Sequence, residues 1–152
     1  MPTRTLLGEF ALAASAHTVF DHVRDPQSYV GLSPLVVSVG DIEEIADGYR
    51  YRAVERVPIV AGWTVDNPLV VTLFARHEAD AYVVHGEVVS PGGIRVWYRY
   101  DITADGEGCR VRDEVVLRTP WGLGRFAAAR ARAVQLARPS VLAQRLTPIV
   151  GT

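Results

Sequence analysis

Apolar and polar residues alternate with a period of two through most of the middle of the chain. This alternation predicts six β-strands, each bounded by the Gly, Pro, Asn and Asp residues that form turns. The strands are expected at residues 35–45, 49–57, 69–77, 81–89, 94–103 and 109–118. The segment from Thr5 to Ala14 predicts an earlier strand.

Two short helical segments are expected between the first strand and the other six. Ser15 stands where an N-cap is needed, and a helical spacing of apolar residues follows it. These apolar residues are Val19, Phe20 and Val23. Asp25-Pro26 ends this helix, and a second helical turn is expected over 27–32, before Ser33-Pro34.

A long helix is expected at the C-terminal end of the chain. Thr119-Pro120 combines an N-cap residue with proline at the first helical position, so the helix should begin there and continue to about Leu146. Pro139 should kink or split it, because proline cannot donate the helical hydrogen bond.

This order of elements, together with several short motifs, resembles the START-like superfamily called SRPBCC. The motifs are the turn at 25–29, the Ser-Pro-Leu-Val-Val segment at 33–37, the Tyr-Arg-Tyr-Arg strand at 49–52, Glu-Arg-Val-Pro at 55–58 and Arg-Asp-Glu-Val at 112–115. The resemblance implies an α+β helix-grip fold, in which a seven-stranded curved antiparallel sheet wraps around a long C-terminal helix. Two short helices follow the first strand in that fold.

The resemblance also implies a pocket for a hydrophobic small molecule. The superfamily includes polyketide cyclases and aromatases, lipid carriers and hormone receptors, so its motifs indicate a fold more closely than a reaction. Its usual Trp after the Asp-Pro turn is absent, and Tyr29-Val30-Gly31 occupies that stretch. This departure should alter one wall of the pocket.

Two hairpin turns predict which side chains face the pocket. A turn centred on Pro91-Gly92 gives paired residues whose numbers add up to 183, and the loop 105–108 gives a sum of 213. The predicted pairs are Val89–Ile94, Glu87–Val96, His85–Tyr98 and Val83–Tyr100, then Ile102–Val111, Tyr100–Asp113, Tyr98–Val115 and Val96–Leu117. The opposite face is rich in Arg, Asp and Glu and is therefore assigned to solvent.

These registers place a polar cluster inside an otherwise apolar pocket. His85, Tyr98 and Asp113 are the candidate catalytic residues, with His85 as general acid or base, Tyr98 orienting a carbonyl and Asp113 supporting them. The ligand-binding candidates are Tyr51, Glu55, Val83, Glu87, Val96, Tyr100, Val115, Phe126 and Arg130. Such a cluster could cyclise and dehydrate a poly-carbonyl substrate, as the cyclases of the superfamily do.

A purely structural explanation of the same cluster is equally open. Asp113 could accept a hydrogen bond from Tyr100, Glu87 could lie at the wet rim, and His85 could be a core histidine with satisfied hydrogen bonds. Glu55 would also belong to the rim. A non-catalytic carrier or sensor of a lipid or aromatic metabolite is therefore the alternative to an enzyme.

Composition narrows the remaining possibilities. The 152 residues suit a single domain, the net charge is −1, and all 16 basic residues are Arg, so nucleic acid is not an expected partner. The single cysteine, Cys109, is in keeping with a cytoplasmic protein. No segment is long and apolar enough to span a membrane. The four histidines lack the spacing of a metal site, and neither a metal nor a cofactor is expected.

The last 35 residues carry six Arg and no Asp or Glu. We expect this helix to cover the cavity with its apolar side and to point its arginines at water or at acids of the sheet. The alternative is contact with an anionic membrane or an acidic carrier protein. A homodimer is a further possibility.

Overall fold

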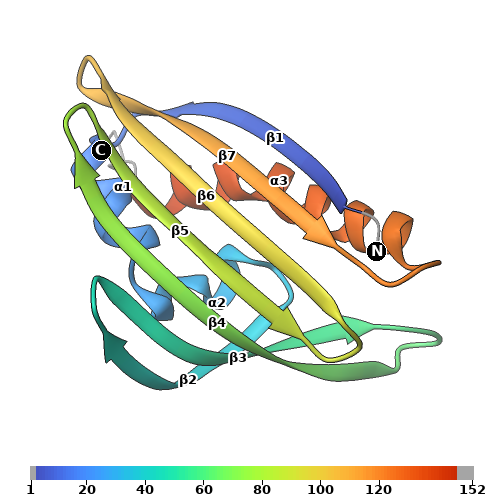
Figure 1. Ribbon diagram of the computed structural model, residues 1–152. Coiled ribbons are helices and arrows are strands. Elements are labelled where there is room, and N and C mark those ends of the chain that lie inside the picture. Colours follow the sequence, from blue (N-terminus) through green and yellow to red (C-terminus); the bar gives the residue numbers. More distant parts are fainter. Residues whose placement is uncertain (1–2, 147–152) are drawn as a thin grey trace.

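The computed structural model describes residues 3–146, which form a seven-stranded antiparallel sheet curved around a long helix (Figure 1). The strand order is β1-β7-β6-β5-β4-β3-β2. The strands are β1 (Thr3–Leu12), β2 (Val36–Ile45), β3 (Gly48–Pro58), β4 (Thr64–Glu78), β5 (Ala81–Ser90), β6 (Ile94–Asp105) and β7 (Gly108–Arg118). The helices are α1 (Ala16–Val23), the 3-10 turn η1 (Pro26–Ser28), α2 (Tyr29–Leu32) and α3 (Gly124–Leu146). This is the expected helix-grip fold.

The short helices form where their capping residues predict them. The Ser15 side chain accepts a hydrogen bond from the Thr18 amide at 3.2 Å, and Asp25 caps η1 through the Gln27 amide at 3.0 Å. The apolar side of α1 is buried. The two short helices close one end of the curved sheet in Figure 1.

The long helix α3 differs from the prediction at its start. It begins at Gly124 and not at Thr119-Pro120. The reason is Gly122, whose φ of 88° is left-handed and interrupts any helix that starts earlier. Of the kink or split expected at Pro139, the split does not occur, because α3 continues as one element through this residue.

Of the two predicted hairpin registers, one is confirmed and the other is wrong. The β6–β7 pairing has the predicted sum, with Tyr100 opposite Asp113. The β5–β6 pairing differs by one residue, with Tyr98 opposite Gly86 and not His85. The connecting loop has three residues, 91–93, and both of its glycines have a positive φ. A slip of one residue moves every side chain of a strand to the other face.

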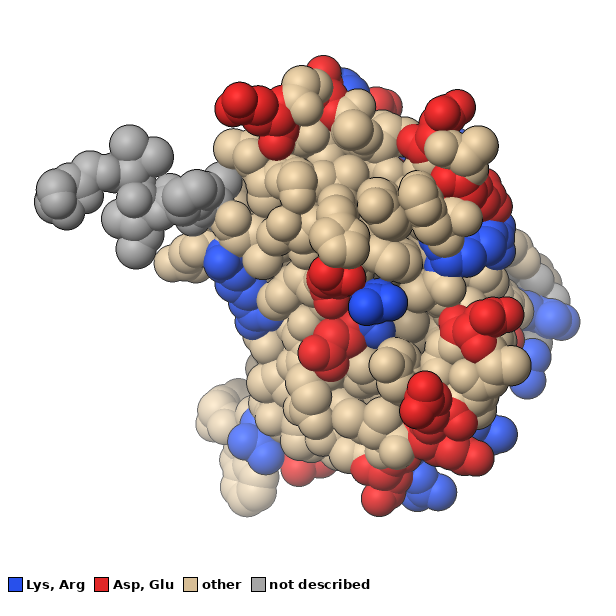
Figure 2. Space-filling model, turned by 90° about the vertical axis from the view of Figure 1, so that its left-hand side faces the viewer, with Lys and Arg blue, Asp and Glu red and all other residues tan. Residues whose placement is uncertain are grey.

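The corrected register fills the concave face with apolar side chains. Leu69, Val71 and Leu73 of β4 point inward and join the core cluster, which resolves a register that the sequence left undecided. Acidic residues gather at the end formed by α1 and the β4–β5 and β6–β7 turns (Figure 2). The opposite end holds the β3–β4 hairpin tip, the β5–β6 turn and the segment that joins β7 to α3 (Figure 1).

Candidate functional site

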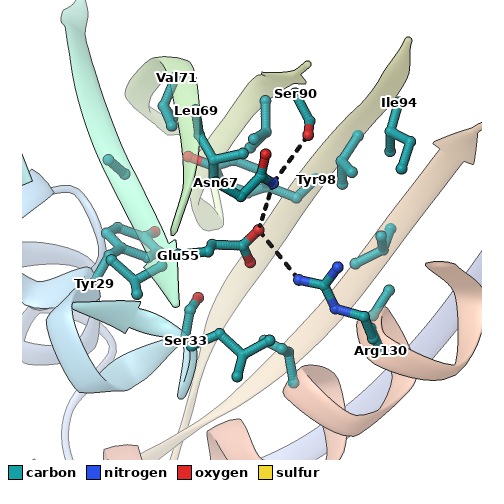
Figure 3. Close-up of a pocket in the computed structure, with 18 of the residues that line it drawn as sticks. Tyr29, Ser33, Glu55, Asn67, Leu69, Val71, Ser90, Ile94, Tyr98 and Arg130 are labelled. Carbon is teal, nitrogen blue, oxygen red and sulfur yellow. Dashed lines mark hydrogen bonds and ion pairs between the residues drawn. The ribbon is translucent and has the colours of Figure 1, made fainter. Parts of the chain in front are cut away.

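A cavity of about 190 Å³ lies between the concave face of the sheet and α3 (Figure 3). Most of its wall is apolar and comes from β3 to β7 and from α3. The apolar lining residues are Leu35, Val36, Ala53, Leu69, Val71, Val88, Ile94, Val96, Val115, Leu117, Ala127, Ala131 and Val134. The polar lining residues are Tyr29, Ser33, Tyr51, Glu55, Asn67, Ser90, Tyr98, Tyr100, Arg130 and Arg138. An apolar wall with a few polar groups is typical of a small-molecule site.

Tyrosines form the inner part of this wall. Tyr29 donates a hydrogen bond from its hydroxyl to the Val23 carbonyl at 2.6 Å. Burial raises the pKa of Tyr29, Tyr51 and Tyr98 above the ordinary value, and it raises the pKa of Tyr100 to about 12. All four phenols are therefore neutral at physiological pH and keep their hydroxyl protons.

The hydroxyl of Tyr98 is buried and makes no hydrogen bond of normal geometry within residues 3–146, although the Tyr29 side chain lies close enough to oppose part of the rise in its pKa. Its ring lies over Gly86, where a Cβ atom would be 2.7 Å from the hydroxyl oxygen. The absence of a side chain at Gly86 thus makes room for the Tyr98 phenol. A buried donor without a partner costs free energy that a ligand oxygen could recover.

A cluster of polar side chains lines the end of the cavity near the β5–β6 turn (Figure 3). Glu55 accepts a hydrogen bond from Asn67 at 3.4 Å and pairs with Arg130 at 3.3 Å. Asn67 also donates to the Ser90 hydroxyl at 3.1 Å. These side chains come from β3, β4, β5 and α3, so they tie the helix to the sheet at this end.

An ion pair lies behind the tyrosines. Asp113 of β7 is completely buried and pairs with Arg138 of α3. Burial raises the pKa of Asp113, and the Arg138 guanidinium opposes that change. The guanidinium also lies 5.0 Å from the centre of the Tyr100 ring, and its Nε has no partner among the described residues. Arg138 lines the cavity, whereas Asp113 does not.

The structure corrects the predicted position of His85. It lies on the outer face of the sheet, opposite Phe74 and Arg99, because of the changed β5–β6 register. Arg76 donates to its Nε2 at 3.1 Å, and the Phe74 ring stacks on it at 5.3 Å. Burial, then Arg76 and Arg99, lower the pKa of His85 below its ordinary value. His85 therefore has no access to the cavity.

The same slip moves two more predicted ligand contacts. Glu87 lies opposite Trp97 on the outer face and 3.8 Å from Arg95, and Val83 lies opposite Asp101. Phe126 is also displaced, because it points to solvent at the start of α3 with the Arg130 guanidinium 5.5 Å from its ring. These three side chains do not line the cavity.

The other predicted ligand-binding residues do line it. They are Tyr51, Glu55, Val96, Tyr100, Val115 and Arg130, together with the candidate catalytic residue Tyr98. The lining residues that sequence reasoning missed include Asn67, Ser90 and Arg138, whereas Tyr29 belongs to the segment expected to alter one wall of the pocket. The helical spacing of Ala127, Arg130, Val134 and Arg138 was the signal that could have found Arg138.

Within residues 3–146, His, Cys, Asp and Glu side chains form no group of three or more that could hold a metal ion. The described helices include none with the length and apolar character needed to cross a membrane.

Comparisons with known proteins identify the family and the fold. Residues 7–144 match a family model described as polyketide cyclase / dehydrase and lipid transport. No curated protein matches the sequence.

Several solved structures share the fold. A START superfamily protein from Mycobacterium smegmatis has a TM-score of 0.71 at 15% identity, with 93% of this chain and 96% of that chain covered. The ZhuI aromatase/cyclase from Streptomyces sp. R1128 also has a TM-score of 0.71, at 16% identity and with 95% and 93% covered. A STAR-related lipid transfer protein from Xanthomonas axonopodis has a TM-score of 0.68 at 20% identity, with 91% and 85% covered.

Proposed function

Because the chain belongs to the polyketide cyclase / dehydrase and lipid-transport family, we propose that it binds a ring-sized hydrophobic molecule whose oxygen accepts a hydrogen bond from Tyr98. The observation that carries this proposal is the buried Tyr98 hydroxyl without a partner on the wall of an apolar cavity. A ligand carbonyl or phenolic oxygen would satisfy it. Binding would then remove the free-energy cost of the unpaired donor, and this gain would favour the bound state.

The size of the cavity favours a compact ligand. An apolar cavity of about 150 Å³ accepts a benzene molecule. The 190 Å³ found here therefore suits one or two rings better than a lipid with long acyl chains. The cluster of Glu55, Asn67, Ser90 and Arg130 would bind a second polar group at the other end of such a molecule.

The first test is native mass spectrometry of the protein purified from its own producer, followed by extraction of the bound molecule. A phenolic or carbonyl-bearing ring compound is expected. A phospholipid or a long-chain fatty acid in the cavity would contradict the proposal. The extracted compound then serves as the probe for the variants.

Tyr98→Phe should weaken binding of that compound roughly threefold to tenfold, as expected for the loss of one hydrogen bond. Tyr82→Phe is the matched control, because Tyr82 stacks on His77 at 4.2 Å and does not line the cavity. Unchanged affinity of Tyr98→Phe would remove Tyr98 from the binding site.

A second candidate function is acid–base cyclisation or dehydration of a poly-carbonyl substrate. The observation that favours it is Glu55, the one carboxylate that lines the cavity among the described residues. Glu55 would take a proton from the carbon between two carbonyls, while Arg130 or Asn67 beside it would donate a hydrogen bond to the enolate oxygen that forms. Glu55→Gln should then abolish product formation and keep ligand binding.

If Glu55→Gln turns over substrate like the parent protein, catalysis at this carboxylate is excluded and the carrier function stands. The catalytic roles expected of His85 and Asp113 have no support from the lining of the cavity, because neither side chain belongs to it.

A further inference from the structure

Large apolar side chains are exposed on two segments at one end of the molecule. Ile59, Val60 and Trp63 lie at the β3–β4 hairpin tip, where Trp63 is 72% exposed. Trp121 and Leu123 lie between β7 and α3, and Trp121 is 83% exposed. We call these five residues the apolar tips. Exposed apolar groups of this size mark interaction sites.

Local backbone structure holds the hairpin tip in an ordered turn. The Ile59 amide donates to the Trp63 carbonyl at 2.9 Å, and the Trp63 amide donates to the Val60 carbonyl at 3.0 Å. Ala61 and Gly62 between them have positive φ angles of 54° and 80°. The exposed Trp63 is thus part of a defined turn.

Both segments of the apolar tips begin and end at the cavity wall. The hairpin leaves the wall at Glu55 and returns to it at Asn67, which is the cross-strand partner of Glu55. The second segment leaves at Leu117 and returns at Ala127 of α3. Figure 1 shows both segments projecting from the same end of the molecule. The apolar tips therefore flank the mouth of the cavity.

The charge at this end is positive. Arg4, Arg118 and Arg125 are exposed and have no carboxylate partner within residues 3–146. Arg118 lies opposite both Thr3 of β1 and Arg95 of β6, and a Cβ at Gly124 would be 3.1 Å from the Arg4 Nε. The opposite end of the molecule carries acidic turns (Figure 2). An anionic surface would therefore attract the cavity end and repel the other end.

We propose that the apolar tips and these arginines dock the cavity mouth on an anionic lipid bilayer. Indole side chains favour the boundary between lipid headgroups and acyl chains, and guanidinium groups match lipid phosphates. The tips come from two separate segments that can each enter a fluid bilayer, whereas a folded acidic partner would need a matching groove for both. A hydrophobic ligand could then pass between bilayer and cavity without crossing water.

Co-sedimentation with vesicles tests this surface. The purified full chain should bind vesicles of equal parts phosphatidylglycerol and phosphatidylcholine, and it should bind pure phosphatidylcholine much less. Added salt should weaken the binding, because the Arg–phosphate attraction is screened. The Trp63→Ser/Trp121→Ser variant should lose about tenfold or more in affinity, and Arg118→Gln/Arg125→Gln roughly fivefold per arginine.

Leu136→Ser is the matched control, because Leu136 is a 69% exposed apolar residue of α3 outside the apolar tips. It should bind vesicles like the parent. No binding of the parent to the anionic vesicles would overturn the proposal, as would equal losses for Leu136→Ser and the Trp variant. A Trp-dependent dimer in sedimentation velocity, without vesicle binding, would assign the surface to a second copy.

An acidic carrier protein is tested as a competitor. If such a protein binds the tips and the anionic vesicles do not, the membrane assignment is wrong. Ligand binding in the cavity is measured without vesicles, so a failure of docking and a failure of the proposed function give different results.

Discussion

Tyr98 occupies the space that Gly86 leaves empty on the neighbouring strand. The two residues are direct cross-strand partners in the β5–β6 hairpin, and the hydroxyl end of the phenol lies where a side chain at Gly86 would begin. A Cβ atom at Gly86 would lie 2.7 Å from the Tyr98 hydroxyl and 2.5 Å from the Thr72 carbonyl oxygen. The position of the unpaired hydroxyl in the cavity therefore depends on a residue that contributes no side chain.

Gly86→Ala should destabilise the protein by about 1–3 kcal/mol and also weaken ligand binding, because the added methyl group must displace Tyr98 and part of β4. Urea unfolding gives the stability, and titration with the extracted ligand gives the affinity. Gly40→Ala is the control, since a Cβ at Gly40 meets nothing within 4 Å. Equal stability of the two variants would show that Gly86 does not make this space.

Sequence periodicity located all seven strands and the β6–β7 register, because alternation and turn residues are local signals. The predicted β5–β6 register was wrong because Ser90-Pro91-Gly92-Gly93 suits a loop of either two or three residues. The loop length decides whether His85 and Tyr98 lie on the same face of the sheet or on opposite faces. The loop length depends on how the flanking strands twist and pack, which a local pattern does not contain.

The inward arginines of α3 were predicted only in part: pairing with acids of the sheet was one expectation and Arg130 was a ligand-binding candidate, but the particular partners were not predicted. A helix that follows the usual amphipathic rule points its charges at water. Arg130 and Arg138 instead face the sheet, because they form ion pairs with Glu55 and Asp113, which lie on strands that are distant in the sequence. Only the tertiary pairing explains their burial.

The buried pair between Asp113 and Arg138 should be costly to break from one side. Asp113→Asn should destabilise the protein by about 3–5 kcal/mol, since it leaves the guanidinium without its counter-charge. The double variant Asp113→Leu/Arg138→Met should lose less than the sum of its single variants. A double-mutant cycle of urea unfolding measures the difference.

The exposed pair between Glu9 and Arg110 is the matched control for that cycle. Its side chains also bridge strands, at 3.3 Å, but both are more than half exposed. Glu9→Gln should change stability by less than about 1 kcal/mol. If Glu9→Gln and Asp113→Asn lose similar amounts of unfolding free energy, burial does not make the pair between Asp113 and Arg138 more costly to break.

Stability should fall as the pH drops below about 6.5, the ordinary histidine value. Burial and a neighbouring arginine lower the pKa of His22 and His85 in the folded state. The unfolded chain then binds more protons than the folded chain in this range, so acid favours unfolding. His22→Gln and His85→Gln should each flatten the slope of unfolding free energy against pH between about 6.5 and 5. NMR titration of the imidazole rings checks the cause, and an unchanged slope in both variants would contradict it.

Tyr98→Phe and Tyr29→Phe should separate binding from stability. Tyr98 has no partner for its hydroxyl, so its removal should leave the free energy of unfolding unchanged within about 0.5 kcal/mol, or raise it slightly. Tyr29 donates to the Val23 carbonyl at 2.6 Å, so its removal should cost about 1 kcal/mol. Ligand affinity should show the opposite order, with the larger loss in Tyr98→Phe. If Tyr98→Phe is destabilised as much as Tyr29→Phe, the Tyr98 hydroxyl stabilises the folded protein through a hydrogen bond within the chain, and it is not free to bind a ligand.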